Sequence, residues 1–184
     1  VEPFKSALRW PLGRGRVHRR KKGDDIWIRS KADRVQFECA LGSFDLPVQP
    51  NHADRFKGHR VLVTQSKNNE IRWIIDWLKF HQRLHGATAA MVYDNNSTLY
   101  SVEELQAELS AAVPDMLIVA LSWPFIFGPQ AGPFAAVNGI EPDWDSDYCQ
   151  DGVLQHARFR FLSQARSVMH NDIDEMVMAE SGRS

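Results

Sequence analysis

The spacing of apolar residues along the chain changes near residue 60. Between residues 25 and 48 apolar and polar residues alternate, which is typical of short strands with one buried face. We expect two such strands there, followed by a connector over residues 45–56, where Pro47 and Pro50 interrupt the pattern. The alternating apolar positions are Ile26, Ile28, Val35, Phe37, Cys39 and Leu41.

From residue 60 onward, short apolar runs alternate with segments of helical periodicity. Residues 61–63 form a buried run, and a strongly amphipathic helix follows. Asn68 or Asn69 is suited to cap the start of this helix, and Gly86 is suited to end it. The apolar face of the helix contains Ile71, Ile74, Ile75 and Leu78.

The same alternation continues to the end of the chain. Residues 89–93 form a second apolar run, and the helix predicted after it begins with Ser101 and Glu104 at the spacing of a capping box. Strands that alternate with helices predict an α/β fold, Rossmann-like, with a mainly parallel sheet flanked by helices. The remaining predicted elements are a helix over residues 101–112, a strand over 116–121, a helix over 153–167 and a strand over 168–178.

Composition narrows the range of partners only slightly. The 184 residues carry a net charge of -1 and 43% hydrophobic residues, so we expect a globular protein without a nucleic-acid partner. Positive charge gathers in residues 14–22, which form either a solvated arm or a patch for peripheral association with a membrane. Cys39 and Cys149 are too few for a disulfide framework, and no apolar run is long enough to span a membrane. These features favour a cytoplasmic location.

Polar segments follow three of the predicted strands, at residues 64–70, 94–98 and 171–175. In an open α/β sheet, ligands bind beyond the carboxyl ends of the strands. The first segment joins a strand to a helix N-terminus, where backbone N–H groups attract phosphate, although helix capping explains it equally well. In the second segment, Asp94 can accept hydrogen bonds from a ribose or a base, but a local Asx turn is the simpler interpretation.

Asp172 and Asp174 lie two positions apart, so on an extended strand both carboxylates share one face. Such a pair repels unless a cation lies between the carboxylates, whose oxygens suit Mn²⁺ or Mg²⁺. The spacing alone has little weight, because residues 143–147 repeat it in a loop that we interpret as solvated. Asp172 and Asp174 differ from that loop because apolar neighbours predict a buried strand around them: Val168, Met169, Val177 and Met178.

Histidine and tryptophan residues offer weaker candidates for a site. His81 and His85 have the i, i+4 spacing of metal ligands on a helix, but the sequence supplies no evident third ligand, so we interpret them as surface residues. Trp73 and Trp77 fit the core-facing side of the first helix. The tryptophans better placed to stack on a sugar are in loops: Trp123 and Trp144.

Two stretches of the chain resemble glycosyltransferase family 92 and related family 2-like enzymes. The first, SKNNEIRWIIDWLKFHQRLHGATAAMVYDNNST, is similar to that family's opening: K-N-E, a helix with E/D-W-L and H, and a strand that ends in Y-D-N-x-S. The second, QHARFRFLSQARSVMHNDIDEMV, is similar to a Gln-led helix followed by a strand and D-I-D-E-F. The two stretches occur in the family's order, and the resemblance covers about residues 60–178.

The resemblance implies a GT-A fold and transfer of a sugar from a nucleotide-diphosphate donor to a hydroxyl acceptor, in surface glycan or polysaccharide synthesis. It implies that Asp172 and Asp174 hold Mn²⁺ or Mg²⁺. The chain departs from the family pattern in its K-N-N-E, which has one residue more than K-N-E, and at Met176, where Phe is common. The resemblance and the strand ends together give these expected nucleotide-sugar-binding residues: Lys67, Asn69, Glu70, Asp94, Asn96, Gln155, Arg158 and Asp172.

In inverting GT-A enzymes the general base lies well after the metal motif, so we expect it, and most of the acceptor site, beyond Ser184. Residues 57–184 are then the nucleotide-sugar-binding half of a transferase domain that is incomplete at its C-terminus, with little transferase activity alone. Residues 1–56 are a basic arm with a small β extension and a connector. Two alternatives stay open: a non-catalytic module that binds a nucleotide sugar or a protein, and a metal-dependent phosphoryl enzyme that uses the same acidic pair.

Overall fold

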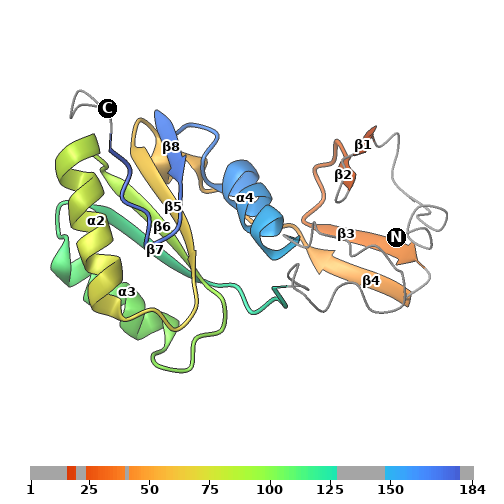
Figure 1. Ribbon diagram of the computed structural model, residues 1–184. Helices are drawn as coiled ribbons and strands as arrows, with labels where there is room; N and C mark the ends of the chain where they lie inside the picture. The colour runs from red at the N-terminus through yellow and green to blue at the C-terminus, as the bar shows by residue number, and fades with distance from the viewer. Residues whose placement is uncertain (1–15, 20–23, 40–41, 128–147, 179–184) are drawn as a thin grey trace, which may run out of the picture. The chain divides into compact units, whose positions relative to one another are not determined.

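A computed structural model describes residues 16–19, 24–39, 42–127 and 148–178 of the chain (Figure 1). The chain divides into two compact units, Val1–Pro50 and Asn51–Ser184, which we describe separately. The second unit begins at Asn51, earlier than the boundary after residue 56 predicted from the sequence.

The segment that follows Pro50 belongs to the core of the second unit, which explains the earlier boundary. Residues Ala53–Phe56 form a 3₁₀ helix, η1, and Phe56 is fully buried. Its ring meets that of Phe161 edge-on, with 5.9 Å between centroids. The backbone N–H of His52 donates to the carbonyl oxygen of Arg160 at 2.8 Å. One large aromatic side chain thus anchors a stretch that resembles a connector in sequence.

The first unit consists of two antiparallel hairpins. The two predicted strands are confirmed as β2 and β3, and two further strands were not predicted. β1 lies in the basic stretch that we expected to be irregular, and β4 overlaps the expected connector. The hairpins pair β1 (Arg16–Arg19) with β2 (Asp24–Trp27) and β3 (Arg34–Cys39) with β4 (Gly42–Pro47).

An ion pair across the second hairpin helps to explain why a polar sequence pairs as strands. Nε of Arg34 on β3 lies 2.9 Å from a carboxylate oxygen of Asp45 on β4. Cross-strand pairs of this kind stabilise a sheet without a buried apolar face, so a search for alternating hydrophobic residues does not detect them.

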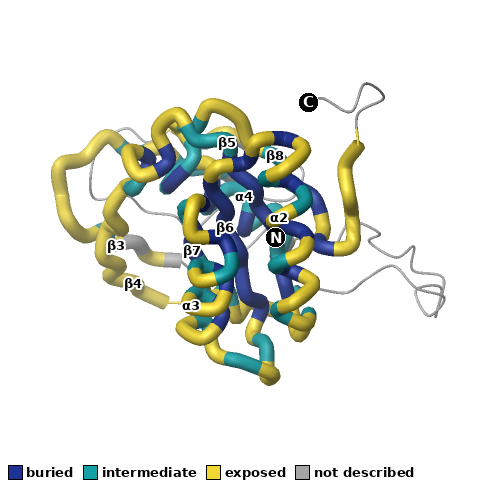
Figure 2. Tube along the Cα trace, turned by 90° about the vertical axis from the view of Figure 1, so that its left-hand side faces the viewer, coloured by how far each residue is buried: buried dark blue, intermediate teal, exposed yellow. Residues whose placement is uncertain are grey.

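The second unit is built on a four-stranded sheet in which all strands are parallel. The strand order is β7-β6-β5-β8. β6 is buried along its whole length (Figure 2), as expected for a strand covered on both faces. The predicted mainly parallel α/β sheet is confirmed, and its order is compatible with a Rossmann-like fold. Its strands are β5 (Arg60–Ser66), β6 (Ala89–Asp94), β7 (Leu117–Ser122) and β8 (Ser167–His170).

Helices cover both faces of this sheet (Figure 1). α2 (Ile71–His85) and α3 (Val102–Ala112) pack on one face, and α4 (Tyr148–Arg160) packs on the other. Connections between parallel strands are right-handed, so the face that a helix covers depends on the direction in which the chain moves across the sheet. The chain moves in one direction from β5 through β6 to β7, and α2 and α3 therefore share a face. The return step to β8 runs in the opposite direction, and α4 therefore takes the other face.

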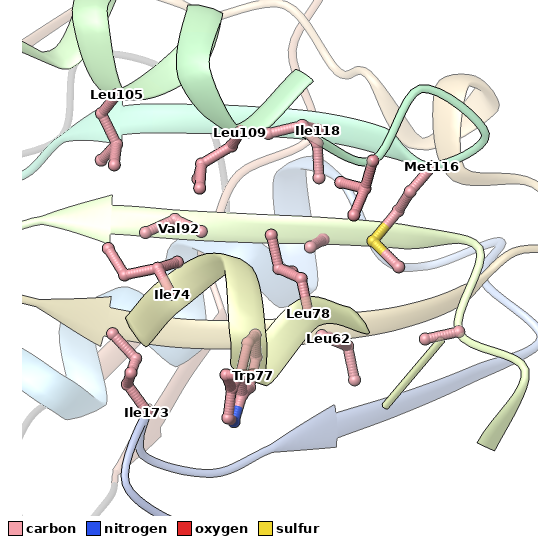
Figure 3. Close-up of a cluster of buried hydrophobic side chains, with 13 residues drawn as sticks. Leu62, Ile74, Trp77, Leu78, Val92, Leu105, Leu109, Met116, Ile118 and Ile173 are labelled. Carbon is pink, nitrogen blue, oxygen red and sulfur yellow. The ribbon is translucent and has the colours of Figure 1, made fainter. Parts of the chain in front are cut away.

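Two apolar cores hold the layers together. Figure 3 shows the core under α2 and α3, where side chains of both helices meet those of the sheet. The core under α4 joins Val153, Ala157 and Phe161 to the opposite face of the strands. α4 overlaps the helix predicted over residues 153–167 but ends earlier, because the N–H groups of Phe161 and Leu162 both donate to the carbonyl of Ala157, at 3.0 Å.

Two of the three predicted helix-end signals are confirmed. Gly86 ends α2 with a left-handed φ of 62°, which favours glycine. Ser101 and Glu104 form the predicted capping box at the start of α3. α2, however, begins after Glu70 without a side-chain cap, because Asn68 and Asn69 make other contacts described below. Within the described residues, no helix is both long and apolar enough to cross a membrane.

Candidate functional site

The strand order places a crevice at the boundary between β5 and β8. The chain passes from β5 to β6 and β7 on one side and then returns to place β8 on the other side of β5, so the direction of the strand order switches between β5 and β8. In open α/β sheets, ligands bind at such a switch point, beyond the carboxyl ends of the strands. A cleft of about 820 Å³ is lined by residues from both strand ends. The lining comprises Gln65, Ser66, Lys67, Asn69, Trp73, Asp76, Asn95, Phe127, Gln150, Asp172, Ile173, Asp174 and Met176.

The loop after β5 contributes Lys67 and Asn69 to the lining of the cleft. Lys67 is exposed. The side-chain amide of Asn69 donates to the hydroxyl of Ser66 at 3.0 Å, and the Tyr100 hydroxyl donates to the Asn69 carbonyl at 2.9 Å. Glu70 occupies the N-cap position of α2 and is exposed, but it is not among the lining residues.

Asp172 and Asp174 line the cleft from a turn, not from a strand. β8 ends at His170. The backbone N–H of Glu175 donates to the Asp172 carbonyl (3.1 Å), and the Glu175 carboxylate accepts from the Asp172 N–H (3.0 Å). Asn171 is buried, and its side-chain amide donates to the Glu175 carbonyl at 2.8 Å. Both aspartate side chains are exposed on this braced turn.

The buried strand predicted around the two aspartates is therefore wrong. Val168 is 48% exposed and Met178 76% exposed. Among the described strands, β8 pairs only with β5, so its own apolar residues lack part of their cover. Ile173 is instead the apolar anchor of the motif, because it is buried in the α2 core between the two exposed aspartates (Figure 3).

Residues at the end of β6 form hydrogen bonds with the loops around them, and one of them, which the sequence did not indicate, lines the cleft. Asp94 is buried, and its carboxylate accepts a hydrogen bond from the Ser97 N–H, three residues on, at 3.0 Å, which closes a local turn. Neither Asp94 nor Asn96, which is exposed with a φ of 61°, lines the cleft. Asn95 does line it, and its amide donates to the Trp123 carbonyl at 2.8 Å.

α4 reaches the cleft through Gln150 in its first turn. The two α4 residues named from the sequence lie farther along the helix and do not line the cleft. Gln155 is half-buried, and Arg158 is exposed with its guanidinium 5.2 Å from the centre of the Phe159 ring. Of these three α4 residues, only Gln150 lines the cleft.

Three polar side chains attach α4 to β6 on its face of the sheet. Arg160 donates to Nε2 of His156 at 3.2 Å, so the imidazole proton lies on Nδ1 and is donated to the Tyr93 oxygen at 2.9 Å. Burial lowers the pKa of His156, with Arg160 adding to the effect, and burial raises the pKa of Tyr93. Both rings are therefore neutral near pH 7 and form a fixed attachment for the helix.

Tryptophan placement differs from the prediction. Trp77 is buried in the core as expected, whereas Trp73 is 53% exposed and lines the cleft. Trp123 packs in the α4 core so close to Gly152 that a β-carbon at position 152 would lie 3.2 Å from its ring. The ring is therefore not free to stack on a sugar. Trp144 and the acidic repeat at residues 143–147 lie outside the described residues.

The two helical histidines are buried, contrary to the surface position expected for them. His81 is 0% and His85 8% exposed. Nδ1 of His81 contacts the Trp77 carbonyl at 2.9 Å, and Nε2 of His85 contacts the Val177 carbonyl at 2.7 Å. The second contact ties the chain after the Asp172–Asp174 turn to α2. Burial lowers the pKa of His81, more than offsetting the carbonyl contact, which raises it.

Charge and donor type in the cleft fit the predicted metal. The lining carries the carboxylates of Asp76, Asp172 and Asp174 and the ammonium of Lys67. Across the described parts of the chain, no group of three or more His, Cys, Asp or Glu side chains is gathered as a metal site. Mg²⁺ and similar ions need only one or two carboxylates, because water and phosphate oxygens complete their coordination. Asp172 and Asp174 meet that requirement.

The chain matches no protein-family model, and no curated protein or solved structure is significantly similar to it. The resemblance to glycosyltransferases therefore stays a prediction from the sequence.

Proposed function

We propose that the unit of residues 51–184 binds the nucleotide-diphosphate part of a sugar donor together with Mn²⁺ or Mg²⁺, as the donor-binding part of a glycosyltransferase. The observation that supports this proposal is the cleft at the switch point, whose lining includes both Lys67 and the Asp172–Asp174 turn. These residues lie far apart in the sequence and belong to the two stretches that resemble the family.

The charges of the cleft support a diphosphate that binds with a cation. A diphosphate alone would meet three carboxylates and one ammonium group, and close like charges repel by several kcal/mol, roughly, at the dielectric of a protein surface. A divalent ion on Asp172 and Asp174 would cancel that excess of negative charge, and it would stabilise charge that develops on the leaving diphosphate. Lys67 donates to phosphate oxygens, and the nearby start of α2 adds the favourable field of a helix N-terminus.

Calorimetry tests the proposal with uridine and guanosine diphosphates, each with and without Mn²⁺. We expect binding that requires the metal and weakens at least about tenfold in Asp172→Asn and in Asp174→Asn. Asp115→Asn is the matched control, because Asp115 is also exposed but lies before β7, at the opposite end of the strands. Its binding constants should equal those of the unmodified chain.

Two other outcomes would contradict the proposal in distinguishable ways. Absence of binding by every nucleoside diphosphate, with metal present, would favour a non-catalytic module. Metal-dependent cleavage of a simple phosphate ester, lost in Asp172→Asn but retained in Asp115→Asn, would favour a phosphoryl enzyme.

A further inference from the structure

Trp73 combines three properties that the core of the protein does not explain. It belongs to the first turn of α2, it is 53% exposed, and it lines the switch-point cleft. The apolar face of α2 is buried through Ile74 and Trp77, and Trp73 lies outside that face. A large indole left half in water forgoes part of the free energy that its burial would give, so a bound group that covers it would recover this energy.

The surroundings of Trp73 suit a ligand group that is a flat ring with polar atoms at its edge. Met176, 46% exposed, also lines the cleft, and it comes from the segment that follows β8. That segment runs along α2, from Ile173 in the α2 core to Val177, whose carbonyl contacts His85 at the far end of the helix at 2.7 Å. Asp76, one turn after Trp73 on α2, lines the same cleft. One of its carboxylate oxygens lies 3.8 Å from Nε of Arg72, and the carboxylate keeps further lone pairs that can accept from an N–H group. Apolar area and a hydrogen-bond acceptor are therefore available on one wall.

We propose that Trp73 is the stacking platform for the nucleobase of the ligand, with Asp76 accepting from an N–H group on the base edge. This inference rests on the proposed function and extends it, because it assigns the base to the α2 wall and the diphosphate to the Lys67 and Asp172–Asp174 region. Stacking of a base on an aromatic side chain contributes about 1–3 kcal/mol, which sets the size of the expected effect.

Calorimetry of the full chain with Mn²⁺ tests this assignment by comparing uridine and guanosine diphosphates with inorganic pyrophosphate. We expect Trp73→Ala to weaken both nucleoside diphosphates by about tenfold or more and to leave pyrophosphate binding unchanged. Trp73→Phe keeps an aromatic face and should restore most of the affinity. Leu84→Ala is the control on the same helix, because Leu84 is 37% exposed and is not among the lining residues, and it should change neither affinity.

The outcomes separate this inference from the proposed function. If pyrophosphate binds with Mn²⁺ through Asp172 while Trp73→Ala leaves nucleoside diphosphate affinity unchanged, the stacking assignment is overturned and the function survives. If neither pyrophosphate nor any nucleoside diphosphate binds, both fail together. Thermal unfolding of each variant shows whether the fold is intact, and Trp73→Phe keeps the test decisive if Trp73→Ala does not fold.

Discussion

The side-chain oxygen of Asn68 accepts a hydrogen bond of 2.7 Å from the backbone N–H of Thr98, and so joins the loop after β5 to the loop after β6. The backbone N–H of Asn68 in turn donates to the Ser97 hydroxyl at 2.8 Å. Asn68 adopts a φ of 54°, a left-handed conformation that asparagine tolerates better than most residues. Asn68 therefore bridges the two loops that follow β5 and β6.

Asn68→Ala should lower the free energy of unfolding by about 2 kcal/mol, because it removes the hydrogen bond to Thr98 and puts alanine, which tolerates the left-handed region less well than asparagine, at this position. Asn68→Gly should cost about 1 kcal/mol, because glycine relieves the backbone strain but not the lost bond. Urea unfolding of both variants measures the difference. Equal stability of the two would show that the left-handed conformation carries no cost.

Lys67→Met should weaken metal-dependent binding of a nucleoside diphosphate by about tenfold, because it removes a charge-assisted hydrogen bond to phosphate while keeping the length of the side chain. The dependence of affinity on salt should also become shallower. Titrations at two salt concentrations provide the measurement. Lys79, exposed farther along α2 and not among the lining residues, gives the control variant Lys79→Met, which should bind normally.

Stability should fall as the pH is lowered, because burial holds the folded-state pKa of His81 below its ordinary value of 6.5. Below pH 6.5 His81 binds a proton in the unfolded chain, whereas in the folded chain it stays neutral until the pH reaches the lowered pKa. The loss therefore begins near pH 6.5 and grows toward acid. Denaturant unfolding from about pH 7.5 to about pH 5.5 should show a shallower slope in His81→Leu. The slope that remains is expected from His156, whose pKa is shifted in the same direction. An identical slope in the variant would refute the assignment to His81.

Ser101→Ala should destabilise the protein by about 1 kcal/mol, because it removes the acceptor for the Glu104 N–H at the start of α3. Ser101→Asp keeps an N-cap acceptor and should recover most of the loss. Chemical unfolding of the three proteins measures both effects. An alanine variant as stable as the unmodified chain would mean that water replaces the cap at no cost.

Local signals in the sequence predicted the sheet of the second unit well. Apolar runs marked β5, β6 and β7, and Ser101 and Gly86 marked helix ends, because each of these features depends on residues close together in the chain. Part of the cleft lining follows from the same kind of local signal. Lys67 and Asn69 follow a strand end directly, so the rule for ligand position in parallel sheets placed them in the cleft.

Side-chain burial and loop geometry could not be read in the same way. Trp73 and Trp77 both suit an apolar helix face, and only packing against the sheet separates the exposed ring from the buried one. The Asp172–Asp174 pair was expected on a strand because apolar neighbours suggested one, whereas β8 ends before it. These outcomes depend on tertiary contacts that spacing does not encode.

The register of β5 and β8 carries a consequence for how the protein folds. Val61 pairs with Val168, so this contact closes a loop that contains α2, α3, α4 and the two other strands of the sheet. Parallel strands that are so far apart in the sequence pair slowly, because closing the long loop between them costs chain entropy before the new contacts stabilise the sheet. We expect the pairing of β5 and β8, and with it the cleft, to form late on the folding pathway. A bound ligand would then act on the unfolding rate more than on the folding rate.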